Sequence, residues 1–512
     1  MLTGDMLRRS AARFPGKTAI IWGKQRIGYA EFDGRANQLA NALLGLGLKK
    51  GAKVGIICRN RPEYAIAFFG VARTGLVLVN ISVLYASEEL AFVLAKADVE
   101  VLLLEDIFAG KIAEARANLP KIKTTIAIGG EIEDALAFDA FITGQDDTEP
   151  AVDLAEDDPF CMTYTGGTTG RPKGVLASHR ARSVTAHTVM VEEAIDERDI
   201  VGICTPMFHV AALNIMFQPA ILAGATVTLL SQWSVEGFAE MASRDRMSAN
   251  FMVPTQANMV IQDEGFDAAA YASWRKMSFA GAPMPDWVQR AFLEKLPEVK
   301  LTQIYGQSEM GVIAVLRHWY LPDKLGCVGR RPYNADVAVV RPDGTHVEPG
   351  EIGEVVSAGD NLMLGYYGEP EQTKGFFKNG DKWGWSGDLA TIDEDGFITL
   401  IDRSKEMIIS GGENIYPSEI ERVLYSHEAV GECAVFGIPD SKWGEVPAAH
   451  VALKSGASVS EEALIAHCAE GLARFKRPRL IKFVEDFPKT AIGKIQKNVL
   501  KAPYWAESEK KI

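Results

Sequence analysis

Residues 164–174 read Tyr164-Thr-Gly-Gly-Thr-Thr-Gly-Arg-Pro-Lys173-Gly174. The ten residues from Thr165 to Gly174 contain four glycines, three threonine hydroxyls and two cationic side chains. Glycines let backbone N–H groups close around an oxyanion without Cβ clashes, hydroxyls donate further hydrogen bonds, and Lys173 adds a positive charge. This composition predicts a phosphate cradle. A Walker A loop is excluded, because Pro172 precedes Lys173 and a glycine follows it.

On both sides of this loop, segments with the apolar spacing of helices alternate with segments that have the apolar pattern of strands. The spacing predicts helices over 32–44 and 64–71 and strands over 54–58, 99–104, 125–128, 249–253 and 301–305. Such alternation is typical of stacked α/β layers. From Ala335, short β runs between turn residues predict a β-rich subdomain over 335–401, and residues 402–512 read as a compact α+β unit. We therefore predict an α/β protein with an N-terminal domain over 1–401 and a C-terminal domain over 402–512.

The charge distribution argues against a nucleic-acid-binding protein. The chain of 512 residues has a formal charge of −13 and is 47% apolar. Residues 402–512 carry 16 basic and 16 acidic side chains, so the whole excess of negative charge lies before them and would repel phosphates. Residues 474–512 hold 11 Lys/Arg against 4 Asp/Glu, which predicts either a solvated basic face or attraction for a small polyanion.

The cysteines and the apolar stretches indicate a cytoplasmic protein without an integral membrane segment. The six cysteines are scattered and form no CxxC pair, as expected of reduced thiols. The N-terminus lacks an apolar signal-peptide region and predicts a short amphipathic helix instead. Residues 200–235 contain no charged side chain, but Pro206, His209, Asn214 and Pro219 interrupt them. We therefore expect a buried strand, a core helix and a second strand in that stretch.

The glycine- and threonine-rich loop resembles the signature of the adenylate-forming superfamily, which holds acyl-CoA synthetases, adenylation domains and firefly luciferase. Within it, the chain looks most like bacterial fatty acyl-CoA ligases. Further segments similar to that superfamily follow in the expected order: Ala280-Gly281-Ala282-Pro283, Tyr305-Gly306-Gln307-Ser308-Glu309, Trp385-Ser-Gly-Asp388, Asp402-Arg403 and Pro488-Lys-Thr-Ala-Ile-Gly-Lys494. The resemblance implies a large N-terminal domain and a small mobile C-terminal domain that turns about a hinge at Asp402.

The resemblance also implies the activity and the nucleotide site. A carboxylic acid and ATP would give an acyl adenylate and pyrophosphate, and CoA would then release acyl-CoA and AMP. Tyr305 would stack on adenine, Asp388 and Arg403 would bind the ribose, and Mg²⁺ would be held by Thr165 and Glu309. The nucleotide-binding set it implies is Thr165, Gly166, Gly167, Thr168, Thr169, Gly170, Lys173, Gly281, Ala282, Pro283, Tyr305, Gly306, Gln307, Ser308, Asp388, Arg403 and Lys494.

Four side chains are the candidates for catalysis: Lys494, Glu309, Lys173 and His209. The ammonium of Lys494 would bridge the carboxylate and the α-phosphate and stabilise charge that develops in the transition state. His209, in Pro206-Met-Phe-His209, resembles the gate between the acyl pocket and the thiol tunnel of related ligases. A core histidine and a general base are the alternatives for His209.

The CoA and acyl sites rest on weaker matches. The resemblance places CoA against Gly411, Gly412, Trp443, Phe475 and Arg477, although a plain basic surface is an equal alternative for the last two. The expected acyl pocket comprises His209, Val210, Asn214, Val253, Gly281, Gly306 and Val312. The segments around these residues, 210–214, 252–255, 280–282 and 306–313, contain no Arg or Lys to pair with a second carboxylate, which argues against dicarboxylic acids.

A medium- or long-chain fatty acid is therefore the first expectation for the substrate. An aryl or cinnamic acid is the alternative, because Asn214 and Gln307 could hydrogen-bond a ring hydroxyl. A second alternative is an adenylation enzyme that loads a carrier protein instead of CoA. No coiled-coil heptad specifies an oligomer, so a homodimer stays open.

Overall fold

The computed structural model describes residues 1–115, 119, 121–165, 172–378, 382–454, 456–489 and 495–506. Contacts between Cα atoms divide the chain into two units, 1–337 with 357–384, and 338–356 with 385–512. The stretch 335–401, predicted as one β-rich subdomain, is thus divided between the units, and the boundary at Asp402 stays a prediction. No helix in the described ranges is both long and apolar enough to span a membrane.

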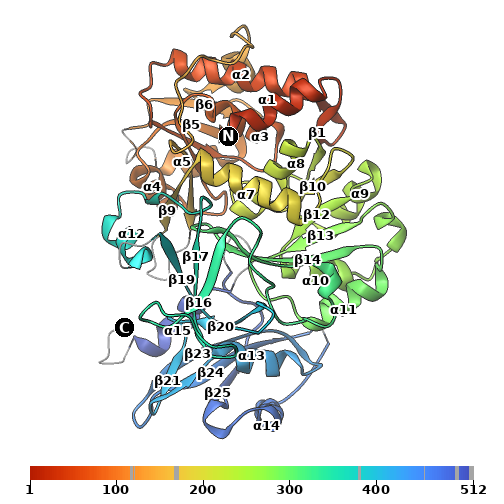
Figure 1. Cartoon of the computed structure of the whole chain (residues 1–512), viewed down its shortest axis with the longest axis vertical. Helices are drawn as coiled ribbons and strands as arrows, with labels where there is room; N and C mark the ends of the chain where they lie inside the picture. The colour runs from red at the N-terminus through yellow and green to blue at the C-terminus, as the bar shows by residue number, and fades with distance from the viewer. Residues whose placement is uncertain are drawn as a thin grey trace. The chain divides into compact units, whose positions relative to one another are not determined.

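One sheet of the first unit supplies most of the candidate site. Its strand order is β15-β14-β13-β12-β10-β11-β1-β2, and β12, β13 and β14 run parallel to β10 (Figure 1). The antiparallel strands β15 and β2 close its two edges. The strands are β1 (Thr18–Trp22), β2 (Gln25–Gly28), β10 (Ile200–Ile203), β11 (Thr226–Leu229), β12 (Ala249–Met252), β13 (Lys276–Phe279), β14 (Lys300–Gln307) and β15 (Gly311–Leu316).

A second sheet of the same unit carries the phosphate-loop strands. Its order is β18-β9-β8-β4-β3-β5-β6-β7, with β8 and β9 antiparallel and β18 antiparallel to β9. The strands are β3 (Lys53–Ile57), β4 (Val77–Asn80), β5 (Val99–Glu105), β6 (Thr124–Ile128), β7 (Leu136–Ala137), β8 (Pro159–Thr165), β9 (Lys173–Ser178) and β18 (Gly365–Tyr366).

The helix α3 (Pro62–Val71) is buried on every face, because its sequence is apolar on every face. The Phe68 ring contacts Phe160 of β8 at 5.1 Å and Phe217 at 6.1 Å between centroids. Edge-to-face aromatic packing thus joins α3 to the second sheet and to the π-helix that follows β10. The other longer helices are α1 (Gly4–Arg13), α2 (Tyr29–Gly45), α4 (Ser87–Lys96), α7 (His179–Glu192), α9 (Val235–Asp245), α10 (Pro254–Gln262), α11 (Asp286–Lys295) and α12 (Pro370–Phe376).

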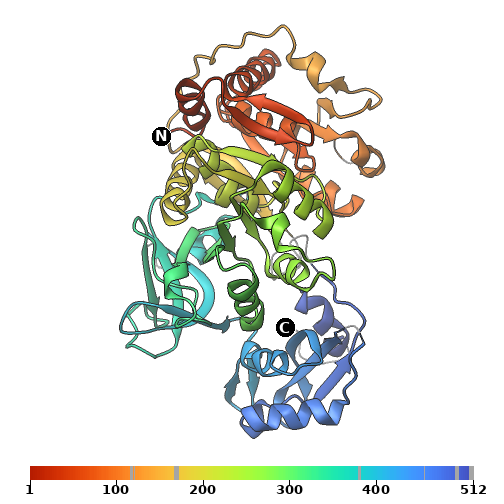
Figure 2. The same cartoon turned by 90° about the vertical axis from the view of Figure 1, so that its right-hand side faces the viewer.

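Not every connection in the first unit is short. Residues 143–158 form an extended run without helix or strand before β8, visible at the top of Figure 2. Asn37 and Asn41 of α2 fix this run by donating side-chain hydrogen bonds to the carbonyls of Asp147, Asp146 and Thr148.

The second unit is built on two smaller sheets. One has the order β16-β17-β19-β20, and the other β22-β21-β24-β23 with β25 beside β24. Ile408, Ile420, Leu424, Val451 and Leu464 belong to its buried core. Its elements are β16 (Asp336–Val340), β17 (Gly353–Ala358), β19 (Trp383–Ile392), β20 (Ile398–Arg403), β21 (Ile408–Ser410), β22 (Glu413–Ile415), α13 (Pro417–Tyr425), β23 (Val430–Asp440), β24 (Gly444–Leu453), α14 (Glu461–Gly471), β25 (Leu480–Phe483) and α15 (Lys497–Trp505).

The α/β prediction is confirmed, and the predicted elements occur within a few residues of their expected ends. The predicted helix over 32–44 is α2, and the strands predicted over 54–58 and 99–104 are β3 and β5. Residues 200–235 contain β10, the π-helix η3 (Ala211–Phe217), α8 (Gln218–Ala223) and β11, as expected of a core segment.

Candidate active site

The parallel strands of the first sheet bring four predicted segments to one edge. His209 follows β10, Val253 follows β12, Gly281 follows β13, and Tyr305 lies near the end of β14. Because β10, β12, β13 and β14 run parallel, these residues all lie at the carboxyl ends of adjacent strands (Figure 1). Ligands of open α/β sheets bind in the crevice outside such strand ends. The topology thus assembles adenine-side and acyl-pocket candidates that are far apart in sequence.

Two glycines lie at this edge, Gly281 in a left-handed backbone conformation and Gly306 at a close backbone approach. Gly281 has φ +91°, and a Cβ there would lie 4.0 Å from the Val253 side chain. A Cβ on Gly306 would lie 2.2 Å from the Gly311 carbonyl oxygen, which no side chain can accommodate. Both glycines therefore keep backbone exposed beside Val253 and Val312, two of the predicted acyl-pocket residues.

His209 stands at the entry to the π-helix η3. Its Nδ1 accepts a hydrogen bond from the Ala211 backbone N–H at 3.2 Å, which leaves the proton of the neutral ring on Nε2. Burial lowers the pKa of His209 to about 4. The imidazole is therefore neutral at physiological pH. π-Helical turns are frequent at functional sites, and the gate, core-histidine and general-base roles of His209 all stay predictions.

A buried polar pair that joins η3 to the start of α8 was missed by the sequence analysis. Gln218 is fully buried, and its Nε2 donates to Oδ1 of Asn214, four residues earlier. Within the described residues, Gln218 Oε1 has no hydrogen-bond partner. The only sequence signal was the i, i+4 spacing of two amides in an apolar run.

The phosphate loop connects two paired strands. Thr165 ends β8 and Lys173 begins β9, and the two residues are register partners. The loop residues Gly166, Gly167, Thr168, Thr169 and Gly170 lie outside the described residues, so their predicted contacts stay predictions. Lys173 Nζ lies 5.2 Å from the centroid of the Tyr366 ring, a cation–π contact.

Glu309 lies in the turn between β14 and β15, and both its side chain and its backbone carbonyl accept hydrogen bonds from the segment 363–366. Its Oε1 accepts a hydrogen bond from the Tyr366 hydroxyl at 2.8 Å, and its carbonyl accepts from the Met363 N–H at 2.8 Å. In the described part of the chain, no group of three or more His, Cys, Asp or Glu is arranged to bind a metal. Mg²⁺ typically takes one or two protein ligands and fills its shell with phosphate oxygens and water. The carboxylate of Glu309 and the hydroxyl of Thr165 are hard oxygen donors that fit this chemistry.

In the second unit, Asp388 and Arg403 are brought together. They are register partners in the antiparallel pair β19–β20, and Arg403 Nε lies 3.1 Å from Asp388 Oδ1. The Ser386 hydroxyl accepts a hydrogen bond from the Asp388 N–H and donates one to the Val355 carbonyl, which ties this part of β19 to β17.

The predicted hinge residue Asp402 caps a helix. Its Oδ2 accepts from the Ser418 N–H at 2.9 Å in the first turn of α13. Burial raises its pKa, opposed in part by Lys497. Lys497 Nζ lies 2.8 Å from Glu421 and 3.4 Å from Glu406, both carboxylates of the same unit. Burial alone would lower the pKa of Lys497, but these carboxylates raise it. Lys494, three residues earlier, lies outside the described residues.

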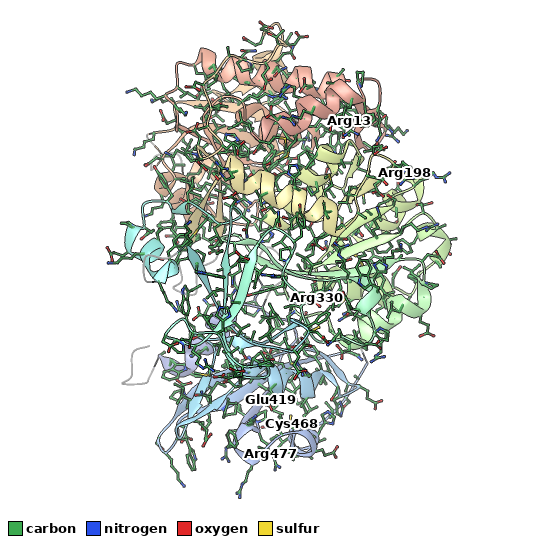
Figure 3. All side chains as sticks on the ribbon, in the orientation of Figure 1. Arg13, Arg198, Arg330, Glu419, Cys468 and Arg477 are labelled. Carbon is green, nitrogen blue, oxygen red and sulfur yellow. The ribbon has the colours of Figure 1, made fainter. Side chains whose placement is uncertain are left out.

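The predicted CoA residues form one close contact. Gly411 has φ +60°, its N–H donates to the Trp443 carbonyl at 2.8 Å, and a Cβ there would lie 2.6 Å from the Trp443 ring. Trp443 and Phe475 are 42% and 40% exposed, unusual for large aromatic side chains. Arg477 donates to the carbonyls of Leu472 and Ala469 at the end of α14, so part of its guanidinium caps a helix. Figure 3 labels Arg477 and, in α14, Cys468.

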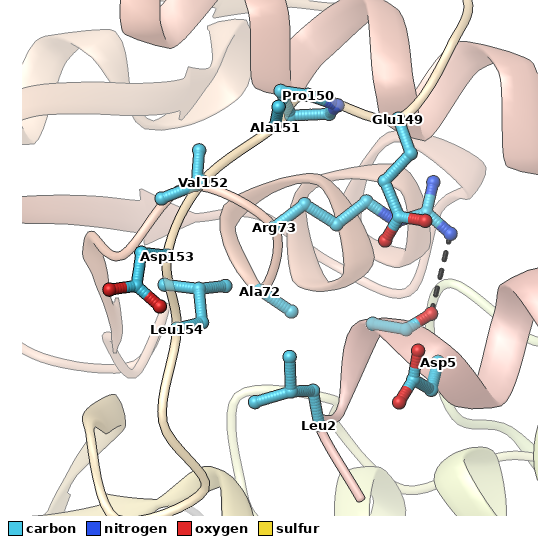
Figure 4. Close-up of a pocket in the computed structure, with 11 residues that line it drawn as sticks. Leu2, Asp5, Ala72, Arg73, Glu149, Pro150, Ala151, Val152, Asp153 and Leu154 are labelled. Carbon is cyan, nitrogen blue, oxygen red and sulfur yellow. Dashed lines mark hydrogen bonds and ion pairs between the residues drawn. The ribbon is translucent and has the colours of Figure 1, made fainter.

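A cavity of about 500 Å³ elsewhere in the first unit contains none of the predicted site residues (Figure 4). Arg73 crosses it, and its guanidinium binds Asp33, Asn37 and the Gly4 carbonyl. These contacts tie α1, α2 and the end of α3 together, which is a structural role.

Two family matches cover most of the chain. Residues 7–367 match the family described as AMP-binding enzyme, and residues 419–494 match the AMP-binding enzyme C-terminal domain. The first match contains the phosphate loop and Glu309, and the second ends at Lys494.

The similar proteins of known activity activate different acids. The chain is 35% identical over 492 residues to feruloyl-CoA synthase of Amycolatopsis sp, with 96% of each chain covered. It is 35% identical over 506 residues to long-chain-fatty-acid–CoA ligase FadD13 of Mycobacterium tuberculosis, with 98% of each covered. Its fold matches the anthranilate CoA ligase AuaEII in complex with anthranoyl-AMP with a TM-score of 0.91, at 28% identity over 98% of this chain and 97% of that one.

Proposed function

This chain belongs to the family of AMP-binding enzymes, and from that premise we propose that it is an ATP-dependent acyl-CoA ligase. A carboxylate oxygen of the acid attacks the α-phosphorus of ATP, and pyrophosphate leaves. The CoA thiol then attacks the acyl carbon and loses its proton, and AMP leaves with the oxygen that the acid supplied. ATP, Mg²⁺ and CoA are thus the small molecules that the enzyme requires.

The chain's own residues supply the binding and catalytic groups for these steps. Lys173 and the phosphate loop bind the anionic phosphates, and Tyr305 at the end of β14 stacks on adenine. Asp388, oriented by Arg403, binds the ribose hydroxyls. Lys494 stabilises the charge that develops at the α-phosphate. Mg²⁺ would be held by Glu309 and Thr165, and when bound it neutralises charge between the two anionic substrates.

One observation carries the proposal: the parallel strands β10, β12, β13 and β14 present His209, Val253, Gly281 and Tyr305 at one edge. An acid and an adenine can lie side by side there, next to the turn that holds Glu309. Proximity of this kind lowers the barrier for a reaction between two bound substrates.

For the acid, we propose a medium- or long-chain aliphatic substrate. The support is chemical, since Val210, Val253 and Val312 are apolar and the windows around them contain no cation for a second carboxylate. The similarity to the long-chain-fatty-acid–CoA ligase agrees with this choice.

An aryl acid is the second candidate, and one observation favours it. The amide pair of Asn214 in η3 and Gln218 at the start of α8 is buried, and Gln218 Oε1 lacks a partner among the described residues. A phenolic hydroxyl that reached this oxygen would donate to a buried acceptor otherwise costly to leave unpaired. Feruloyl-CoA synthase is a relative of the same identity.

We propose CoA rather than a carrier protein as the acceptor. Gly411 leaves backbone exposed beside Trp443, and residues 474–512 hold 11 Lys/Arg against 4 Asp/Glu, as suits a polyanionic nucleotide thiol. A cytoplasmic location is supported by the six cysteines, all of them buried free thiols.

The test measures AMP formed from ATP and Mg²⁺ with C4 to C18 fatty acids, benzoates and cinnamates, each with and without CoA. We expect catalytic AMP formation only with CoA and a maximum within one class of acid. If AMP formation does not depend on CoA, another molecule is the acyl acceptor. If activity is highest with ferulate-like acids, the substrate is an aryl acid and not an aliphatic one.

A further inference from the structure

Tyr366 touches two predicted catalytic side chains at once. Its hydroxyl donates to Glu309 Oε1 at 2.8 Å, and its ring lies 5.2 Å from Lys173 Nζ. Glu309 lies in the turn between β14 and β15 of the first sheet, and Lys173 begins β9 of the second. Tyr366 is therefore a direct physical link between the predicted metal ligand and the predicted phosphate ligand.

The backbone around Tyr366 is held firmly where this link is made. Residues 365–366 form β18 against β9, and the N–H groups of Leu364 and Tyr367 donate to the Leu176 and Gly174 carbonyls at 2.8 Å each. The Tyr366 N–H donates to the Thr373 hydroxyl at 2.9 Å. A Cβ on Gly365 would lie 2.8 Å from Thr373, so the strand can approach α12 only with glycine there.

The same segment also fixes the turn that carries Glu309. The Met363 N–H donates to the Glu309 carbonyl, and the Asn361 amide donates to the Met310 carbonyl. Backbone and side chain of Glu309 are thus both oriented by residues 361–366.

The ring of Tyr366 is not packed on all sides. It borders a cavity of about 490 Å³ that is also lined by Leu176, Leu364 and Phe377. With open space beside the ring, the hydrogen bond to Glu309 contributes to fixing both the ring and the carboxylate.

We propose that Tyr366 is a positioning residue that sets the divalent-cation affinity of the nucleotide site through Glu309. A hydrogen bond to one carboxylate oxygen restricts rotation of the group and holds its other oxygen in one direction. Partners that hydrogen-bond a metal-ligating carboxylate typically change metal affinity by about 10- to 100-fold when they are removed. The inference rests on the proposed function only for the identity of the metal ligand.

Tyr367 supplies a matched control. Its hydroxyl also donates to a carboxylate, Asp98 Oδ2 at 3.0 Å, and its ring also lies beside a lysine, Lys53 at 4.6 Å. Neither Asp98 nor Lys53 belongs to the predicted site. Tyr367→Phe therefore removes a bond of the same kind, one residue away, without touching Glu309.

The experiment measures Mn²⁺ binding by electron paramagnetic resonance of the free ion, in the presence of α,β-methylene ATP. For Tyr366→Phe we expect the Mn²⁺ Kd to rise about tenfold. The Mg²⁺ concentration that gives half-maximal AMP formation should rise by a similar factor, with the KM for the acid unchanged. Tyr367→Phe should stay within about twofold of the wild type.

A double-mutant cycle separates positioning from general loosening of the fold. If Tyr366 acts through Glu309, Tyr366→Phe should have no further effect on Mn²⁺ binding in a Glu309→Gln background. Wild-type Mn²⁺ affinity in Tyr366→Phe, an equal loss in Tyr367→Phe, or full additivity with Glu309→Gln would each overturn the proposal. If the wild-type protein forms no AMP with any acid, the proposed function fails, while the binding comparison still tests Tyr366.

Discussion

Arg403 Nε lies 3.1 Å from Asp388 Oδ1, because the two residues face each other across the antiparallel strands β19 and β20. The hinge candidate Asp402 directly precedes Arg403 and caps α13. The predicted ribose ligand, its orienting cation and the hinge are therefore parts of one short β-hairpin.

Asp388→Asn is expected to raise the KM for ATP by about 10- to 100-fold, since a hydrogen bond to a charged group contributes about 1.5–3 kcal/mol. The KM for the acid should change little. Steady-state kinetics with varied ATP check this. Asp393→Asn is the control, because Asp393 lies on the same hairpin, in the turn beyond the other end of β19, where its carboxylate accepts hydrogen bonds from the backbone N–H groups of Asp395 and Phe397. An unchanged ATP KM in Asp388→Asn would remove the ribose assignment.

Lys494→Ala is expected to slow adenylation by orders of magnitude and to leave the conversion of preformed acyl adenylate to thioester nearly intact. The reason is that its ammonium stabilises charge only while the carboxylate attacks the α-phosphate. Pyrophosphate exchange measures the first half-reaction, and single-turnover reaction of synthetic acyl adenylate with CoA measures the second. Equal loss in both would contradict the role.

Gly411→Ala is expected to slow thioester formation at least about tenfold, because the new Cβ would strain a left-handed backbone and meet the Trp443 ring. Pyrophosphate exchange should be retained. Gly456→Ala is the matched control, since Gly456 also has positive φ, +75°, but has open space around it. If Gly411→Ala left the reaction with CoA unchanged, the CoA site would have to lie elsewhere.

The stability of the fold should depend on pH through Glu193 at the end of α7. Burial raises the pKa of Glu193 to about 7, although Ser278, Arg317 and Thr302 act in the opposite direction. The folded state therefore binds this proton more tightly than the unfolded state. The stabilisation is complete below about pH 4.5 and is lost as pH rises through about 7, an effect on the order of 3 kcal/mol.

Glu193→Gln should remove this part of the pH dependence. The free energy of unfolding of the variant, relative to that of the wild type, should therefore be higher at pH 8 than at pH 5. Urea unfolding at both pH values measures it. The same pH profile in wild type and variant would show that Glu193 does not titrate in this range.

The spacing of apolar residues predicted the helices and strands whose formation depends on neighbouring residues in the sequence. Residues 54–58 form β3 because a short apolar run suits a buried parallel strand, and residues 32–44 lie in α2 because their apolar side chains share one face. The Tyr305 and Asp388 segments could be recognised because their residue types and spacing match a known family.

Tyr366 could not be found in this way. Its role depends on the pairing of β18 with β9, almost 190 residues earlier in the chain, and on a turn that lies between these two segments in sequence. The hydrogen bond of Gln218 was not predicted either. The sequence shows an amide in an apolar segment, but its partner is identified only in the folded structure. The roles of Lys497 and Arg477 likewise depend on tertiary contacts with Glu421 and with the end of α14.

The transfer of oxygen from the acid to AMP tests the proposed chemistry most directly. The acid, labelled with ¹⁸O in its carboxylate, is incubated with enzyme, ATP, Mg²⁺ and CoA, and AMP is examined by mass spectrometry. Attack of the carboxylate on the α-phosphorus predicts one ¹⁸O atom in each AMP formed together with acyl-CoA. Unlabelled AMP, or label in inorganic phosphate with ADP as the product, would contradict an acyl-adenylate route.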